Sequence, residues 1–365
     1  MISTKEPVVF DIEIMGAGED VVFFFGARHL PSGKTIGVWG DDQNGLDKVA
    51  ALLRNPNYLF VSFNGIRFDA PILAAVLGGR SIPEVKRMAN RIIEENKPAW
   101  MTHRDENLER LDIDHIDLIE VAPGVMINLK LYGARMGVKS ITDLPYKHDQ
   151  ILNAEERAKL ADYCLNGDLV ITAELFKRLQ KQLELREQMT ETYGIDLRSK
   201  SDAQIAEVVF AKQLGIRGAV PVPSSVRYTA PSFIQPKNMI IADMLAKAQR
   251  HSFAVNQGNG AIILPPFLEE PILLGNGRYQ MGIGGLHSQH DKQQHWIARD
   301  DLEISDFDVE SFYPNVILNA NLIPRGLGVP FVSLYRQLLD ERVGAKRRVG
   351  EIKKRLKEID RALKE

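Results

Sequence analysis

Two acidic residues in an apolar segment near the start of the chain have the spacing of a metal-binding pair. Residues 7–14 read PVVFDIEI, and their β-branched and aromatic side chains predict a strand. Residues two apart in a strand point to the same face, so Asp11 and Glu13 lie together, opposite an apolar face. Two carboxylates about 6–7 Å apart repel by roughly 2–3 kcal/mol at an effective dielectric near 20. Mg²⁺ would relieve this repulsion. The alternative is a strand whose acidic face is exposed to solvent.

Two further acidic residues stand beside apolar segments. Asp69 lies in NGIRFDAP, directly before the apolar run APILAAVL, and Asp168 lies in YCLNGDLVIT. Each has a simpler explanation. Asp69 could cap a helix that begins before Pro71, and Asp168 could be a partly solvated acid on a helix. Taken in order with Asp11 and Glu13, however, the two acids predict a site of four carboxylates.

The order and context of these acids resemble the proofreading 3′–5′ exonuclease domain of family-B DNA polymerases of the bacteriophage type. Three motifs match: Asp-x-Glu on a strand, Asn-x3-Phe-Asp, and a tyrosine followed by an aspartate. The matching residues are Asp11 and Glu13, then Asn64, Phe68 and Asp69, then Tyr163 and Asp168. The phrases INLKLYGARMGVKSITDLP and RSKSDAQIAE also look like polymerases of this group. The resemblance implies a ribonuclease H-like α/β domain over residues 1–195.

The resemblance also implies a role for each acid. Two Mg²⁺ or Mn²⁺ ions about 3.5–4 Å apart would flank the scissile phosphate. Asp11 would bind both ions, Glu13 and Asp168 would complete one of them, and Asp69 would support the other. Tyr163 would orient the attacking water. The expected reaction is removal of nucleotides from the 3′ end of DNA.

The expected substrate is a single-stranded 3′ end. By the resemblance, Asn64 and Phe68 would contact the frayed end of a primer–template, with Phe68 as a stacking surface that does not read the base. Two other functions remain open at this stage. One is a stand-alone exonuclease that trims DNA or RNA, and the other is a catalytically silent DNA-binding subunit of a split polymerase.

The third motif departs from the family in its spacing. The tyrosine version has four residues from tyrosine to aspartate, whereas Tyr163 and Asp168 are five apart. At 100° per residue, five residues leave about 140° between the two side chains on a regular helix. We therefore predict a helix break or a π-bulge near residues 166–167, where the glycine is a weak helix former.

A second, incomplete site is predicted further along the chain. SDFDVESFYPNVI resembles the first palm motif of family-B polymerases, which implies that Asp308 binds the polymerase metals and Tyr313 packs beneath the incoming sugar. MGIGGLHSQ looks like the family's Gly-Gly element, with Gly284 and Gly285 at the DNA backbone. The alternative is an acid-bearing edge strand. The remaining palm motifs do not follow, so we expect polymerisation only if the missing palm is supplied, for example by the remaining half of a split polymerase.

The expected fold class is an α/β exonuclease domain, then an incomplete α+β palm and a long basic helix. The expected divisions are residues 1–195, a connector with the start of the palm over 196–300, a palm strand over 301–332, and a basic helix over 333–365 as the start of the fingers. The segment from Arg336 to Glu365 contains eleven Lys/Arg and six Asp/Glu, so its local net charge is +5. A solvated coiled-coil-like helix is the alternative there. A further helix is expected over residues 153–185, with Asn153 as its N-cap.

Bulk composition sets wide bounds. The formal net charge of −2 neither supports nor excludes a nucleic-acid partner, because such partners respond to local basic faces. The lone cysteine, Cys164, excludes an internal disulfide and suits a reducing cytoplasm, that of the bacterial host for a phage protein. We expect no membrane partner, since no apolar run approaches the ~18 residues of a membrane span.

Overall fold

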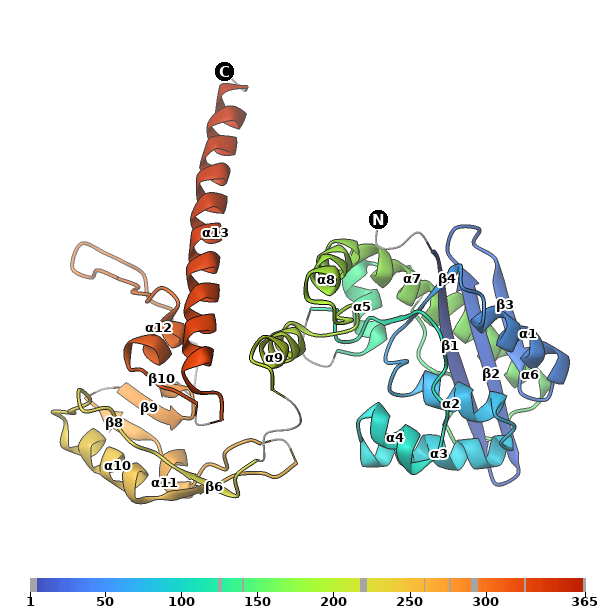
Figure 1. The fold of residues 1–365 in the computed structure, drawn as a ribbon, viewed down its shortest axis with the longest axis horizontal. Helices are drawn as coiled ribbons and strands as arrows, with labels where there is room; N and C mark the ends of the chain where they lie inside the picture. The colour runs from blue at the N-terminus through green and yellow to red at the C-terminus, as the bar shows by residue number, and fades with distance from the viewer. Residues whose placement is uncertain are drawn as a thin grey trace. The chain divides into compact units, whose positions relative to one another are not determined.

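The computed structural model describes residues 5–123, 127–139, 141–216, 222–258, 260–275, 277–289, 295–324 and 326–363. The chain divides into two compact units, Met1–Val209 and Phe210–Glu365. Figure 1 shows the first unit in blue to green and the second in yellow to red. Each unit is described by itself. Among the described residues, no helix combines the length and the apolar character needed to cross a bilayer.

The first unit is built on a five-stranded mixed sheet, in the order β3-β2-β1-β4-β5. Its strands are β1 (Glu6–Ala17), β2 (Asp20–His29), β3 (Thr35–Trp39), β4 (Tyr58–Ser62) and β5 (His115–Asp117). The strands β1, β2 and β3 are antiparallel neighbours, whereas β1, β4 and β5 run parallel. The first unit is therefore a mixed α/β fold, and the strand expected over residues 7–14 is confirmed.

Strand β1 is buried on both faces because its two alternating sets of side chains meet different helices. One set, from Val8 to Ile14, packs with α1 (Gln43–Leu53), α2 (Asp69–Leu77) and α3 (Ile82–Glu95). On the other face, Val9 packs in a second core with α5 and α7. These helices span Leu129–Met136 and Leu169–Arg178. Asp11 and Glu13 belong to this second face, so they lie beneath helices rather than on an open strand surface.

The helical stretch expected over residues 153–185 is present but interrupted. It comprises α6 (Ala154–Tyr163), a π-helical turn η1 (Cys164–Asp168), α7, and then α8 (Gln180–Tyr193). Asn153 is the N-cap as predicted, since its side chain accepts a 3.0 Å hydrogen bond from the backbone N–H of Glu156. The remaining helices of the region are α4 (Ala99–Asp105) and α9 (Asp202–Gln213), which crosses the division between the units.

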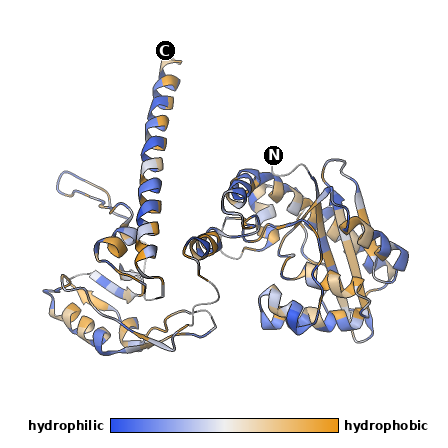
Figure 2. Ribbon diagram, in the orientation of Figure 1, coloured by the Kyte–Doolittle hydropathy of each residue, from blue (hydrophilic) through white to orange (hydrophobic). Residues whose placement is uncertain are grey.

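The second unit contains two small antiparallel sheets and four helices among its described residues. The strands are β6 (Ser225–Arg227) with β7 (Ser252–Ala254), and β8 (Ile272–Leu274), β9 (Gly277–Gly282) and β10 (Gly285–Ser288). The helices are α10 (Met239–Arg250), α11 (Pro266–Glu269), α12 (Phe312–Asn319) and α13 (Gly328–Ala362). In Figure 2, α13 is mostly hydrophilic with scattered apolar positions, and its apolar residues from Val349 onward are exposed.

The palm strand expected in EISDFDVESFY is a wrong prediction. Residues 303–309 form no strand, and α12 begins at Phe312 within the same phrase. An extended segment becomes a stable strand only when its backbone groups pair with a neighbour. In the described part of the chain, residues 303–309 have no such ladder partner.

Candidate active site

Three acidic side chains from two distant segments meet at the centre of the first unit. Asp11 and Glu13 come from β1, and Asp69 is the first residue of α2, directly after the connection that follows β4. The Asp69 carboxylate accepts a 3.1 Å hydrogen bond from the backbone N–H of Ile12. The N-cap alternative for Asp69 is thereby excluded, because Phe68 holds that position and makes no side-chain capping bond. Asp69 instead fixes the start of α2 against β1.

Burial makes the charged forms of these three acids unfavourable. It raises the pKa of Asp11 to about 6, although a hydrogen bond with Asp69 and the positive charge of Lys130 oppose the shift. The pKa values of Glu13 and Asp69 lie well above their usual range, first because of burial and then because of the Asp11 charge. Oxygen ligands crowded at such a cost are the donor set that Mg²⁺ or Mn²⁺ favours, so these residues fit a divalent ion.

The π-turn η1 packs on this face directly beside Asp11. Gly26 of β2 is the register partner of Asp11, and a Cβ at Gly26 would lie 2.6 Å from the Cys164 sulfur. The absence of that side chain lets η1 approach the sheet. The Cys164 thiol lies 4.0 Å from Oδ2 of Asp11, and burial raises its pKa well above the usual range. Ligand atoms of Asp11, Glu13 and Cys164 all lie within 4.8 Å of one another.

The π-turn predicted from the spacing of the third motif is confirmed. The N–H of Leu169 donates to the carbonyl of Cys164, five residues back, as a π-helix requires. Five residues therefore complete about one turn, and Tyr163 and Asp168 face the same neighbour. That neighbour is Lys130 of α5, whose ammonium forms an ion pair with Asp168 and lies 4.1 Å from the Tyr163 ring centroid.

Asp168 does not belong to the closest group of potential metal ligands. It forms an ion pair with Lys130 instead. Within the described residues, the group of potential ligands within 4.8 Å contains Cys164, not Asp168 or Asp69. The positive charge of Lys130 also acts to lower the pKa values of Asp11 and Glu13, against the effect of burial. Burial raises the pKa of the Tyr163 hydroxyl, with further contributions from Glu13 and Asp11, so the phenol is protonated at neutral pH.

The connection between β4 and α2 carries the two expected DNA contacts, Asn64 and Phe68. Asn64 has a left-handed backbone with φ 67°. The carboxylate of Asp117, at the end of β5, accepts the N–H groups of Asn64 at 2.7 Å and Ile66 at 2.9 Å. Phe68 is partly buried, and with Glu13 it lines a hollow of about 440 Å³ between β1 and α3. The residue expected to stack on the DNA end, Phe68, and the acid Glu13 thus line the same hollow.

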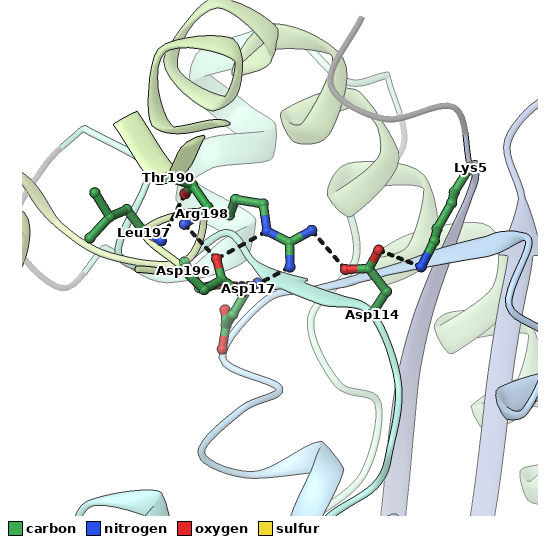
Figure 3. Close-up of polar contacts among 8 residues, drawn as sticks. Lys5, Asp114, Asp117, Thr190, Asp196, Leu197 and Arg198 are labelled. Carbon is green, nitrogen blue, oxygen red and sulfur yellow. Dashed lines mark hydrogen bonds and ion pairs between the residues drawn. The ribbon is translucent and has the colours of Figure 1, made fainter. Parts of the chain in front are cut away.

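An ion-pair network braces the strand that carries Asp117. Figure 3 shows Arg198 between Asp196 and Asp114, with Lys5 on the other side of Asp114. The Arg198–Asp114 and Lys5–Asp114 distances are 2.7 and 2.8 Å. The neighbouring Ser199 accepts the backbone N–H of Asp117 at 2.9 Å. The RSKS phrase therefore ties the α8–α9 connection to the edge of the sheet.

Neither Lys130 nor Asp117 was among the residues expected at the site. The available signal for Asp117 was weak: an acid at the end of a short apolar segment, DHIDLI, in a position like that of Asp69. For Lys130 it was a single basic residue within the family-like phrase INLKLYG. Their partners lie 38 and 53 positions away in sequence, so only the fold identifies them.

The second expected site is only partly assembled within its unit. The Tyr313 hydroxyl donates a 3.2 Å hydrogen bond to the carbonyl of Gly284, so two of the expected DNA contacts meet. Gly285 follows with φ 133° at the start of β10. Asp308 is exposed, and it belongs to no group of potential metal ligands in the described part of the chain.

Comparisons with known proteins give little further. No family model and no curated protein matches the chain. A solved structure described as "Exonuclease I (apo)" is similar at a TM-score of 0.23 and 11% identity, over 52% of this chain. The match spans 45% of that structure's own length, less than half of it. A TM-score of this size does not establish a shared fold.

Proposed function

We propose that the first unit is a metal-dependent 3′–5′ exonuclease acting on single-stranded DNA ends, of the proofreading type in family-B DNA polymerases. One observation carries the proposal. Partly buried Asp11 and Glu13 and fully buried Asp69 converge from distant segments, and a π-turn brings Tyr163 and Asp168 to the same lysine beside them. A purely structural cluster of buried acids would be destabilising without a cation.

The acids would hold Mg²⁺ or Mn²⁺ at the face of β1. Bound divalent ions supply an activated water and stabilise the charge that develops on the phosphate and the leaving 3′ oxygen. Asp11 and Glu13 offer carboxylate oxygens on one strand face, and Asp69 is aimed there by its bond to Ile12. The protonated Tyr163 hydroxyl can donate a hydrogen bond and orient the attacking water.

The DNA end would occupy the space between Phe68 and Glu13. Phe68 supplies an aromatic surface to the terminal base, and base stacking of this kind is independent of sequence. Asn64, whose backbone N–H donates to Asp117, would supply a side-chain amide to the DNA end. The second unit would contribute backbone contacts through the Gly284–Tyr313 pair, and Asp308 would act in polymerisation only if further palm elements were supplied.

The test follows a 5′-labelled single strand through time in Mg²⁺. Wild type is expected to shorten it stepwise from the 3′ end, and a terminal phosphorothioate at that end is expected to slow the first step. Asp11→Ala and chelation by EDTA are expected to lower the rate by more than about 10²-fold, the order of loss for one essential transition-state interaction.

Matched controls distinguish a proofreading exonuclease from a trimming enzyme and from a catalytically silent DNA-binding subunit. Asp308→Ala removes an expected metal ligand in the second unit and is expected to leave degradation unchanged. An RNA strand of the same sequence distinguishes a DNA proofreader from a trimming enzyme. Equal degradation by wild type and Asp11→Ala would overturn the proposed function, and no degradation by a folded wild type would favour a silent DNA-binding subunit. Primer extension is expected to give no product.

A further inference from the structure

Lys130 occupies a position that helix stability does not explain. It is the second residue of α5, whose N-cap Asn128 accepts the N–H of Leu131 at 2.8 Å. A cation in the first helical turn is unfavourable, because the N-terminus of a helix carries partial positive charge. Its side chain is nevertheless turned into the unit and is only 20% exposed. An interaction outside α5 must therefore hold it there.

The ammonium of Lys130 meets three parts of the proposed site at once. It forms an ion pair with Asp168 and lies over the ring of Tyr163, 4.1 Å from the centroid. Its charge also acts on Asp11 and Glu13 of β1. The nearby Lys86 differs, since its ammonium donates to the carbonyls of Ile14 and His148 and so supports the backbone.

We propose that Lys130 is an exchangeable counter-ion: it holds Asp168 in the metal-free protein, yields it to a divalent ion, and then pairs with a phosphate oxygen of the bound strand. The inference rests on the proposed function. A divalent ion bound to Oδ1 of Asp168 would repel the ammonium that contacts the same oxygen. A lysine is suited to exchange, since its point charge sits on a flexible four-carbon stem. The ring of Tyr163 keeps the released ammonium beside the site through cation–π attraction.

The first test measures Mn²⁺ binding to the full chain without DNA, by the electron paramagnetic resonance of free Mn²⁺. Lys130→Met removes the competing charge while keeping an unbranched side chain, so its Mn²⁺ dissociation constant is expected to fall. The expected change is on the order of tenfold, the size seen for neighbours of metal ligands. Lys130→Arg should bind Mn²⁺ much as wild type does. Lys177→Met, which breaks the Lys177–Glu174 ion pair on α7, is the matched control and should change nothing.

The second test measures degradation kinetics at saturating metal. Lys130→Met is expected to raise KM for single-stranded DNA on the order of tenfold, as for one lost hydrogen bond to a charged group. Lys130→Arg should restore much of the loss. If Lys130 had a purely structural role, replacing it would lower the melting temperature and leave KM and the Mn²⁺ dissociation constant unchanged. Lys130→Gln serves as a second neutral variant should the methionine variant not fold.

The outcomes keep the two proposals apart. If Asp11→Ala leaves Mn²⁺ binding and degradation unaltered, the proposed function fails and the role of Lys130 fails with it. If Asp11→Ala abolishes both but the neutral Lys130 variants bind Mn²⁺ as wild type does, only the counter-ion role is overturned. Weaker Mn²⁺ binding by those variants would overturn it as well.

Discussion

The two units place their expected functional residues in opposite environments. In the first unit, Asp69 is 3% exposed and its carboxylate bonds to the backbone of a neighbouring strand. In the second, the segment around Asp308 forms no strand, and Phe307 beside it is 92% exposed. Both segments were identified from motifs of the same family. The difference teaches that a motif fixes residue types, whereas packing within the unit decides whether those residues are held in place.

The contrast extends to the way each unit orders its loops. In the first unit, a buried acid, Asp117, binds the N–H groups of a connection that carries Asn64. In the second unit, Tyr313 holds Gly284 through one hydrogen bond and is itself 63% exposed. We therefore expect equivalent substitutions to have large effects in the first unit and small effects in the second.

The largest expected effect comes from Asp117→Ala. The substitution leaves the N–H groups of Asn64, Ile66 and Ile119 without their acceptor, and each orphaned buried donor costs about 1–3 kcal/mol. We expect the free energy of unfolding, measured by urea denaturation, to fall by at least about 3 kcal/mol. Asp308→Ala is the matched control and should change it by less than about 0.5 kcal/mol. A comparable loss in both variants would break the contrast between the units.

A pH-dependent effect of about 2–3 kcal/mol is expected for Asp11→Asn. The pKa of Asp11 in the folded protein is about 6, above the ordinary value of 3.8, so folding favours the protonated form. The stability contributed by this group is therefore present below pH 4 and lost as pH rises through 6. Asparagine imitates the protonated form, and each pKa unit corresponds to about 1.4 kcal/mol. In EDTA, Asp11→Asn should thus unfold at a higher temperature than wild type at pH 7.5 and at a similar temperature at pH 4.

Magnesium should reverse that order. Wild type is expected to gain stability when Mg²⁺ is added at pH 7.5, because a ligand that binds only the folded state stabilises it. Asp11→Asn should gain much less, since it lacks a carboxylate oxygen for the ion. A variant that is less stable than wild type in EDTA at every pH would contradict the unfavourable burial of Asp11.

Local patterns allowed much of the first unit to be predicted. The alternation in PVVFDIEI placed Asp11 and Glu13 on one face, and the spacing of Tyr163 and Asp168 required the π-turn that is present. Lys130 could not be predicted, because its partners become neighbours only when α5 packs on α7, the helix that follows η1. The strand expected around Asp308 failed for a related reason: its residues suit a strand, but pairing is a property of the fold rather than of the segment.

The close approach of η1 to the sheet predicts opposite effects for one substitution at two glycines. A Cβ at Gly26 would lie 2.6 Å from the sulfur of Cys164, so Gly26→Ala should destabilise by about 1–3 kcal/mol through overpacking. At Gly167 the nearest atom is the Thr142 hydroxyl at 3.8 Å. Gly167→Ala should therefore stabilise the π-turn by about 0.5–1 kcal/mol. Thermal unfolding of the two variants is the measurement, and shifts of the same sign would contradict the packing described for Cys164.

The smallest effect is expected on α13 of the second unit, where apolar residues are spaced as in a heptad seam. Ile352 and Leu356 are 56% and 54% exposed. Replacing both with alanine removes little buried area and keeps a strong helix former, so the free energy of unfolding should change by less than about 0.5 kcal/mol. Gly26→Ala in the first unit serves as the positive control for the same denaturation measurement. A melting temperature of wild type that rises with protein concentration, and that the double variant lowers, would show that the seam packs against a second copy. The contrast between buried functional residues in the first unit and exposed apolar residues in the second would then hold only for the isolated chain.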